Sequence, residues 1–153
     1  MLFKHIPKLV INTLIAIAAI GFVDATYLTI NHFQNGTPPC FVGSCEVVLT
    51  SAYSVMFGIP TALYGALYYL FILICLGVYI ESHHVVTKQK SLTLVLATTV
   101  IGMGMSIYFF CIQAFVLHAF CQYCLVSAVT STLLFIISVF VVVKYRLPRD
   151  LKS

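Results

Sequence analysis

Two cysteines separated by two residues, Cys121 and Cys124, form the sharpest chemical motif in the chain. In the first turn of a helix, their sulfurs share one face and point at backbone N–H groups that have no partner within the helix. The positive end of the helix dipole lowers a thiol pKa and favours the thiolate, which is the attacking form in disulfide exchange. The pair therefore predicts redox chemistry, with a static disulfide or two metal ligands as the alternatives.

A second pair, Cys40 and Cys45, lies in a stretch rich in glycine and proline. Two dithiols on the same side of a membrane can pass a disulfide from one to the other by thiolate attack through a mixed disulfide. Two purely structural disulfides are the alternative. A zinc site would require these cysteines to gather with His32 or His118, and we expect no metal.

The composition of the chain indicates where these cysteines must be held. Of its 153 residues, 61% are hydrophobic and 8% are charged, and the mean hydropathy is +1.08. Soluble domains carry roughly a quarter charged residues, so a soluble fold is excluded. The net charge of +4 is too small and too scattered for a nucleic-acid-binding surface.

Four apolar runs predict four membrane-spanning helices, at about residues 9–30, 59–80, 92–115 and 121–143. Backbone amides find no water in the lipid core, so these segments are expected to be helical throughout. The chain is predicted to be an all-α integral membrane protein. We expect residues 1–153 to form one four-helix domain in the lipid bilayer.

The basic residues predict the orientation of this bundle. They precede the first run, lie in the expected loop between the second and third runs, or follow the fourth, which places both termini in the cytoplasm. All eight are Lys4, Lys8, Lys88, Lys90, Lys144, Arg146, Arg149 and Lys152. The loop 31–58 and the turn near 116–120 then face outward with both cysteine pairs. Cys75 and Cys111 fall inside apolar runs and are interpreted as small hydrophobic residues.

A relay of disulfides needs a final electron acceptor. A CxxC pair at the bilayer boundary, between apolar helices, is well placed to meet a lipid-soluble one. A quinone is therefore the expected acceptor.

The loop pair, Ser51, the segment 58–65 (GIPTALYG) and the CxxC pair followed by Leu125 together resemble a bacterial homologue of vitamin K epoxide reductase. The resemblance spans nearly the whole chain. It implies a four-helix bundle around a quinone with an extracytoplasmic loop cap, in the bacterial inner membrane. It also implies a role in oxidative protein folding, in which a thioredoxin-like (DsbA-like) partner is reoxidised. We expect residues 1–153 to carry no fused thioredoxin-like domain, and we therefore expect the partner to be a separate chain.

The resemblance also implies a role for each cysteine. Cys124 is expected nearest the quinone, and Cys121 is expected to be attacked by Cys45. Cys40 is the other shuttle cysteine, and the partner enters through the Cys40–Cys45 disulfide at a sulfur that the sequence does not specify. Ser51 matches a serine near the quinone pocket.

Two departures from the animal enzymes concern the ligand. Where those enzymes have an asparagine in the second helix and a tyrosine beyond the CxxC pair, this chain has Thr61 and Ala128. A respiratory quinone, ubiquinone or menaquinone, is therefore expected in place of the vitamin epoxide. Thr61 or Ser127 is expected to donate a hydrogen bond to a quinone oxygen.

Asp24 lies within the first apolar run, where a carboxylate costs about 2.5 to 3.5 kcal/mol on the insertion scale. It is therefore expected to face the interior of the bundle. Two roles stay open, proton delivery to the reduced quinone and a neutral acid hydrogen-bonded to a neighbouring helix.

Two other classes of function fit parts of the sequence. A small four-helix transporter with structural disulfides would need no bound quinone. A haem or metal carrier would use His32 and His118, although both are also ordinary residues for a membrane interface.

Overall fold

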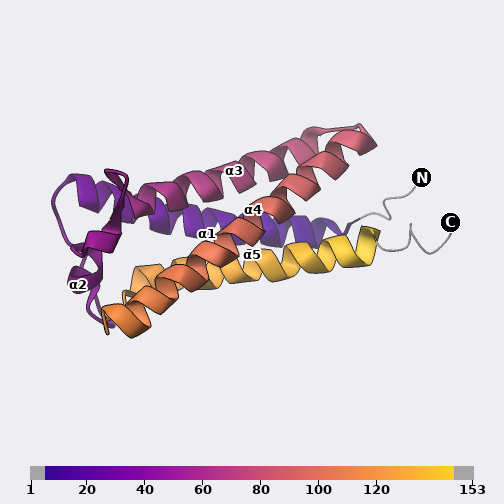
Figure 1. The fold of residues 1–153 in the computed structure, drawn as a ribbon. Coiled ribbons are helices and arrows are strands. Elements are labelled where there is room, and N and C mark those ends of the chain that lie inside the picture. Colours follow the sequence, from indigo (N-terminus) through magenta and orange to yellow (C-terminus); the bar gives the residue numbers. More distant parts are fainter. Residues whose placement is uncertain (1–5, 147–153) are drawn as a thin grey trace.

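The computed structural model describes residues 6–146, in which four long helices lie side by side and a short segment covers one end (Figure 1). The long helices are α1 (Lys8–Phe33), α3 (Thr61–Glu81), α4 (Val85–Cys111) and α5 (Gln122–Arg146). A π-helix, η2 (Ile112–Val116), continues α4. Four helical segments are long and apolar enough to cross a membrane. This confirms the predicted all-α membrane bundle.

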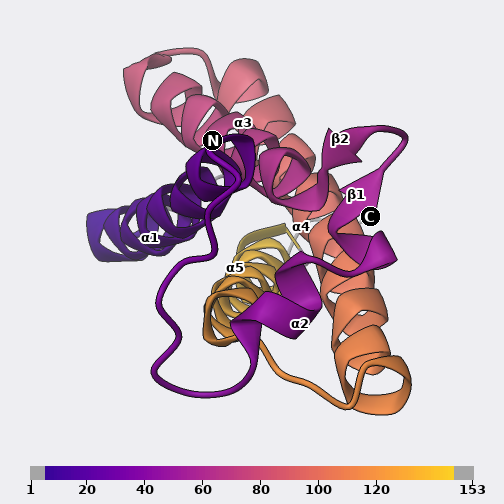
Figure 2. The same cartoon turned by 90° about the vertical axis from the view of Figure 1, so that its left-hand side faces the viewer.

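The covering segment, here called the cap, consists of residues 37–60. It contains α2 (Cys45–Leu49), the 3₁₀ helix η1 (Ala52–Ser54) and two short strands, β1 (Val55–Met56) and β2 (Ile59–Pro60). The strands pair antiparallel, with Val55 opposite Pro60. Figure 2 shows α2 lying over the end of the bundle in front of α5, and the hairpin at the edge of that end, beside α3 and α4.

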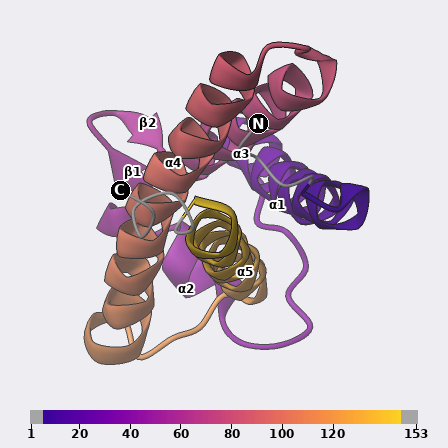
Figure 3. The same ribbon diagram turned by 90° about the vertical axis from the view of Figure 1, so that its right-hand side faces the viewer.

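The long helices form a ring in which each contacts two neighbours (Figures 2 and 3). α1 and α4 each pack against both α3 and α5. The buried core is apolar, and its tightly packed side chains stabilise the bundle through many small dispersion contacts. Its main cluster is Leu14, Ala18, Ala25, Ala66, Tyr69, Ile72, Cys75, Leu76, Val95 and Leu134.

The observed helix ends differ from the apolar runs. α4 begins at Val85, well before the expected residue 92, so Lys88 and Lys90 lie in its first turns and not in a loop. A helix satisfies its own backbone groups, so it can continue past the apolar run into polar surroundings. The expected span 92–115 also conceals a change of geometry, because the α-helix ends at Cys111 and becomes a π-helix.

The basic residues that the structure describes gather at one end of the bundle. Lys8 begins α1, Lys88 and Lys90 lie at the start of α4, and Lys144 and Arg146 lie at the end of α5. In Figure 1 this end lies opposite α2 and the cap. Lys4, Arg149 and Lys152 lie outside the described residues.

Candidate active site

The loop cysteines form a disulfide. Cys40 and Cys45 are bonded, with their Cα atoms 5.8 Å apart. Cys45 is the first residue of α2 and is only 1% exposed, whereas Cys40 is partly exposed. The bond therefore joins a partly exposed cysteine to a buried one.

The other pair lies where α5 begins, and both of its thiols are free. Cys121 immediately precedes α5 and is 0% exposed, and Cys124 lies in the first turn. The Cys124 thiol is hydrogen-bonded to the Cys121 sulfur, which outweighs the effect of burial and lowers the pKa of Cys121 to about 7. Cys121 is thus the thiol of this pair that most readily carries a negative charge near neutral pH.

The remaining two cysteines lie in membrane-spanning helices. Cys75 is buried in the core of α3, and Cys111 is exposed at the end of α4. Neither lies at the junction between the cap and α5.

The loop that carries the disulfide is docked on the CxxC motif. Gly43 pairs with Cys121 in an antiparallel bridge, and the Ser44 N–H donates to the Phe120 carbonyl over 2.8 Å. Gly43 has φ +91°, and a Cβ atom there would collide with the Phe120 carbonyl oxygen. Only glycine permits this close approach, which brings the loop backbone directly against Cys121.

Gln113 holds Cys121 from the other side. Its side-chain oxygen accepts a hydrogen bond from the Cys121 N–H at 2.9 Å, and its side chain is buried. Gln113 lies in η2, so the π-helical turn aims it at the start of α5. Sequence reasoning missed this residue, although a single glutamine within the apolar stretch 107–117 was an available signal.

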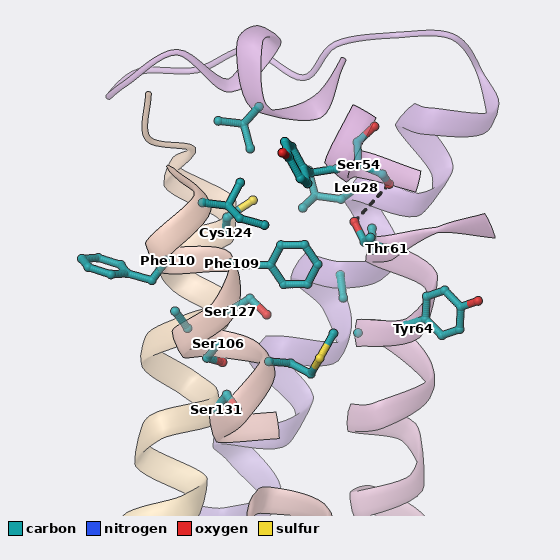
Figure 4. Close-up of a pocket in the computed structure, with 18 of the residues that line it drawn as sticks. Leu28, Ser54, Thr61, Tyr64, Ser106, Phe109, Phe110, Cys124, Ser127 and Ser131 are labelled. Carbon is teal, nitrogen blue, oxygen red and sulfur yellow. Dashed lines mark hydrogen bonds between the residues drawn. The ribbon is translucent and has the colours of Figure 1, made fainter. Parts of the chain in front are cut away.

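A cavity of about 580 Å³ lies beneath the cap, walled by the ends of all four long helices. Cys124 lines it, and Figure 4 shows the Cys124 sulfur near the cap with Ser127 and Ser131 further along α5. These three residues follow the spacing i, i+3 and i+7, which places them on one face of a helix. The expected ligand-binding residues Ser51, Thr61 and Ser127 all line this cavity.

The hydroxyl groups of Ser51 and Thr61 already donate hydrogen bonds within the protein. Ser51 donates its proton to the Val48 carbonyl at 2.7 Å, and Thr61 donates to the Ser54 carbonyl at 3.1 Å (Figure 4). A hydroxyl has a single proton, so these two groups offer the cavity only acceptor lone pairs in this arrangement.

Two cavity tyrosines were not anticipated. The Tyr69 hydroxyl lies 2.7 Å from Thr130 Oγ1 and 3.1 Å from Ser127 Oγ, and the Tyr68 hydroxyl lies 3.2 Å from Ser131 Oγ. They connect α3 to the serine face of α5. Adjacent tyrosines in an apolar helix were the only sequence signal.

Asp24 of α1 also lines the cavity. Its Oδ2 atom is buried and has no hydrogen-bond partner among the described residues. Within the described residues the structure thus supplies no neighbouring-helix partner for this oxygen.

The two histidines considered above lie apart from these groups. His118 occupies the turn before Cys121 with φ +48°, and the His32 ring packs edge-on against Phe33. Among residues 6–146, no three His, Cys, Asp or Glu side chains gather as a metal site would require.

No curated protein matches the chain. The family model described as the vitamin K epoxide reductase family matches residues 12–139, a span that includes both cysteine pairs and all the residues that line the cavity. The chain therefore belongs to the vitamin K epoxide reductase family, whose members are membrane thiol oxidoreductases.

Proposed function

We propose that this membrane thiol oxidoreductase generates disulfides by oxidising a thioredoxin-like (DsbA-like) partner and passing the electrons to a quinone. One arrangement carries the proposal. A disulfide that joins a partly exposed cysteine to a buried one is docked on the CxxC motif, and the second cysteine of that motif lines a large cavity.

The exposure of the loop cysteines supports an order for the first exchange. A partner thiolate attacks Cys40, the more exposed residue, to form a mixed disulfide, and Cys45 leaves as a thiolate. A second partner thiol then attacks the mixed disulfide and releases Cys40. The partner has lost two electrons to the loop pair, and both sulfurs of the loop are reduced.

The second exchange moves those electrons inward. With the CxxC pair oxidised, the Cys45 thiolate attacks Cys121 and releases Cys124, and Cys40 then attacks Cys45 and releases Cys121. A leaving thiol with a low pKa departs faster. The lowered pKa of Cys121 supports its role as the final leaving group. The exchange restores the loop disulfide and leaves the two free CxxC thiols seen here.

The cavity fits a quinone head group. Its volume lies within the roughly 300–1,000 Å³ of small-molecule sites, and the unpaired Asp24 Oδ2 marks a polar position with no partner in the protein. Members of this family use quinones, and we propose ubiquinone or menaquinone here. When bound, the quinone accepts two electrons and two protons. Cys124 is the cysteine placed at this cavity, with Ser127, Thr61 and Ser51 on its walls.

Asp24 is proposed to hold a proton for this reaction. A carboxyl group in an apolar helix is more stable when protonated, and the Asp24 side chain lines the cavity with its Oδ2 atom buried and unpaired. It can therefore donate a proton there without breaking a hydrogen bond at Oδ2.

The membrane orientation follows from charge. We propose a bacterial cytoplasmic membrane with both termini in the cytoplasm, because the described lysines gather opposite the cap. The disulfides then face the periplasmic or extracytoplasmic side. We further propose that residues 1–153 act as one domain and that the thioredoxin-like partner is a separate chain.

Quinone reduction by the purified protein in detergent tests the proposal. The assay follows quinone absorbance with a reduced thioredoxin-like protein as the donor, and the Cys124→Ala protein serves as the control. We expect turnover that the substitution abolishes. Absence of turnover with ubiquinone and menaquinone analogues would contradict the proposal and favour a small transporter with structural disulfides.

A further inference from the structure

Gln122, the first residue between the two CxxC cysteines, clamps the loop that carries the other cysteine pair. Its side-chain oxygen accepts hydrogen bonds from two consecutive backbone amides, those of Phe41 and Val42, each at 3.1 Å. Both amides lie inside the ring closed by the Cys40–Cys45 disulfide. A single side-chain oxygen of the CxxC motif therefore holds the middle of the Cys40–Cys45 loop.

The next residue of the motif adds a second attachment. The Tyr123 hydroxyl donates to the Pro39 carbonyl at 3.0 Å. Together with the Gly43–Cys121 bridge, these contacts bring one side of the loop against the start of α5. Both residues between the CxxC cysteines thus bind the loop through their side chains.

Packing does little to hold this part of the loop. The Phe41 and Val42 side chains are 88% and 69% exposed, so they bury little apolar surface against the bundle. Hydrogen bonds must therefore fix the position of this segment, and Gln122 supplies two of them. Removing its oxygen leaves two backbone amides without that acceptor.

Position matters because exchange between the pairs requires two sulfurs to meet. Cys45 and Cys121 are both almost fully buried, and the loop bridge brings their backbones near each other. Orientation of reacting groups raises the effective concentration of one for the other. We propose that Gln122 is a positioning residue that holds the loop in the register in which Cys45 reaches Cys121.

This inference rests on the proposed exchange between Cys45 and Cys121, and it can be tested without quinone or partner. The parent protein carries Cys40→Ser and Cys124→Ser, which leaves Cys45 and Cys121 as the reacting pair. Oxidised glutathione converts these two thiols to one disulfide and gives two molecules of reduced glutathione. Mass spectrometry of the linked peptides at a series of glutathione ratios gives the effective concentration of the two thiols.

Three further substitutions in this parent separate positioning from a general loss of structure. Gln122→Leu removes the acceptor, Gln122→Glu keeps a side-chain oxygen of the same reach, and Gln89→Leu makes the same chemical change on α4 at the other end of the bundle. We expect Gln122→Leu to lower the effective concentration about tenfold, equivalent to about 1.4 kcal/mol. Gln122→Glu and Gln89→Leu are expected to match the parent.

The outcomes distinguish this inference from the proposed function. An unchanged effective concentration in Gln122→Leu, or an equal loss in Gln122→Glu or Gln89→Leu, would overturn the positioning role alone. A parent in which Cys45 and Cys121 form no disulfide would overturn both the positioning role and the proposed exchange.

Discussion

The two ends of the helical bundle are built in different ways. At the end remote from the cap, Ile6, Ile11, Leu92 and Val141 close into an apolar cluster. At the cap end the same helices surround a cavity, and the loop above it exposes Phe41 and Val42. The first end is held by packing, and the loop over the second is held largely by hydrogen bonds.

The packed end stabilises the bundle, and the cap end is suited to disulfide exchange. Dense packing resists local opening, whereas a segment with few buried apolar contacts opens at a lower free-energy cost. A loop that exchanges disulfides with a partner and with an inner motif must release one contact to make the next. The sparse packing of the cap end suits that task, and the closed end keeps the helices in place while the loop moves.

The largest expected effect comes from the four cysteines at the cap end. Replacing Cys40, Cys45, Cys121 or Cys124 by alanine is expected to abolish quinone reduction with a protein donor, because each sulfur forms a bond during the exchange. The measurement is quinone absorbance with a reduced thioredoxin-like donor.

The matched controls are Cys75→Ala and Cys111→Ala, which remove free thiols that belong to neither cysteine pair. Both are expected to retain turnover. Full activity in Cys45→Ala would show that electrons bypass the loop. The cap end would then differ from the opposite end in packing but not in disulfide exchange.

A smaller effect is expected at the cavity. Asp24→Asn keeps the shape of the side chain but removes its acidic proton, and we expect quinone turnover to fall about 100-fold, at the low end of general-acid contributions. The Cys45–Cys121 exchange, measured by trapping, is expected to be unchanged. Wild-type turnover in Asp24→Asn would leave this carboxyl without a role in proton transfer.

Sequence alone was sufficient for the bundle but not for the junction. Apolar runs of membrane-spanning length mark the four helices because hydropathy is a local property. The bonds from Phe41 and Val42 to Gln122 join residues about 80 positions apart and leave no local pattern. The Gly43 contact with Phe120 is hidden for the same reason. The Gln113 contact with Cys121 spans only eight positions, but it depends on the π-helical turn that carries Gln113. The predicted start of α4, at residue 92, was wrong because the helix continues through polar residues, among them Lys88 and Lys90, that lie outside the apolar run.

A pair of small side-chain truncations compares the two kinds of construction directly. Ile72 is fully buried in the core, and Ile72→Val is expected to lower the free energy of unfolding by about 0.5–1.5 kcal/mol while turnover stays unchanged. Val42→Ala also shortens an apolar side chain, but in the exposed loop, and is expected to leave stability unchanged. Thermal unfolding in detergent measures both. An equal loss in Val42→Ala would show that the loop is held by packing after all.

A pH dependence of stability is expected at the CxxC motif. The folded protein lowers the pKa of Cys121 from 9.0 to about 7, so the reduced folded state releases a proton more readily than the unfolded chain. The resulting stabilisation is fully present above pH 9 and is lost as the pH falls through about 7. Thermal unfolding of the reduced protein, compared with Cys121→Ser between pH 6 and 9, measures it.

Groups outside the CxxC pair are shared by the two proteins, so the difference in unfolding temperature reports Cys121 together with its hydrogen-bonded partner Cys124. We expect that difference to shift in favour of the wild type between pH 7 and 9. In protein oxidised to the Cys121–Cys124 disulfide neither sulfur titrates, and this pH dependence should vanish. A difference that stays constant with pH in the reduced protein would mean that the cap end does not favour the Cys121 thiolate, and the final leaving group would then lack the electrostatic support proposed for it.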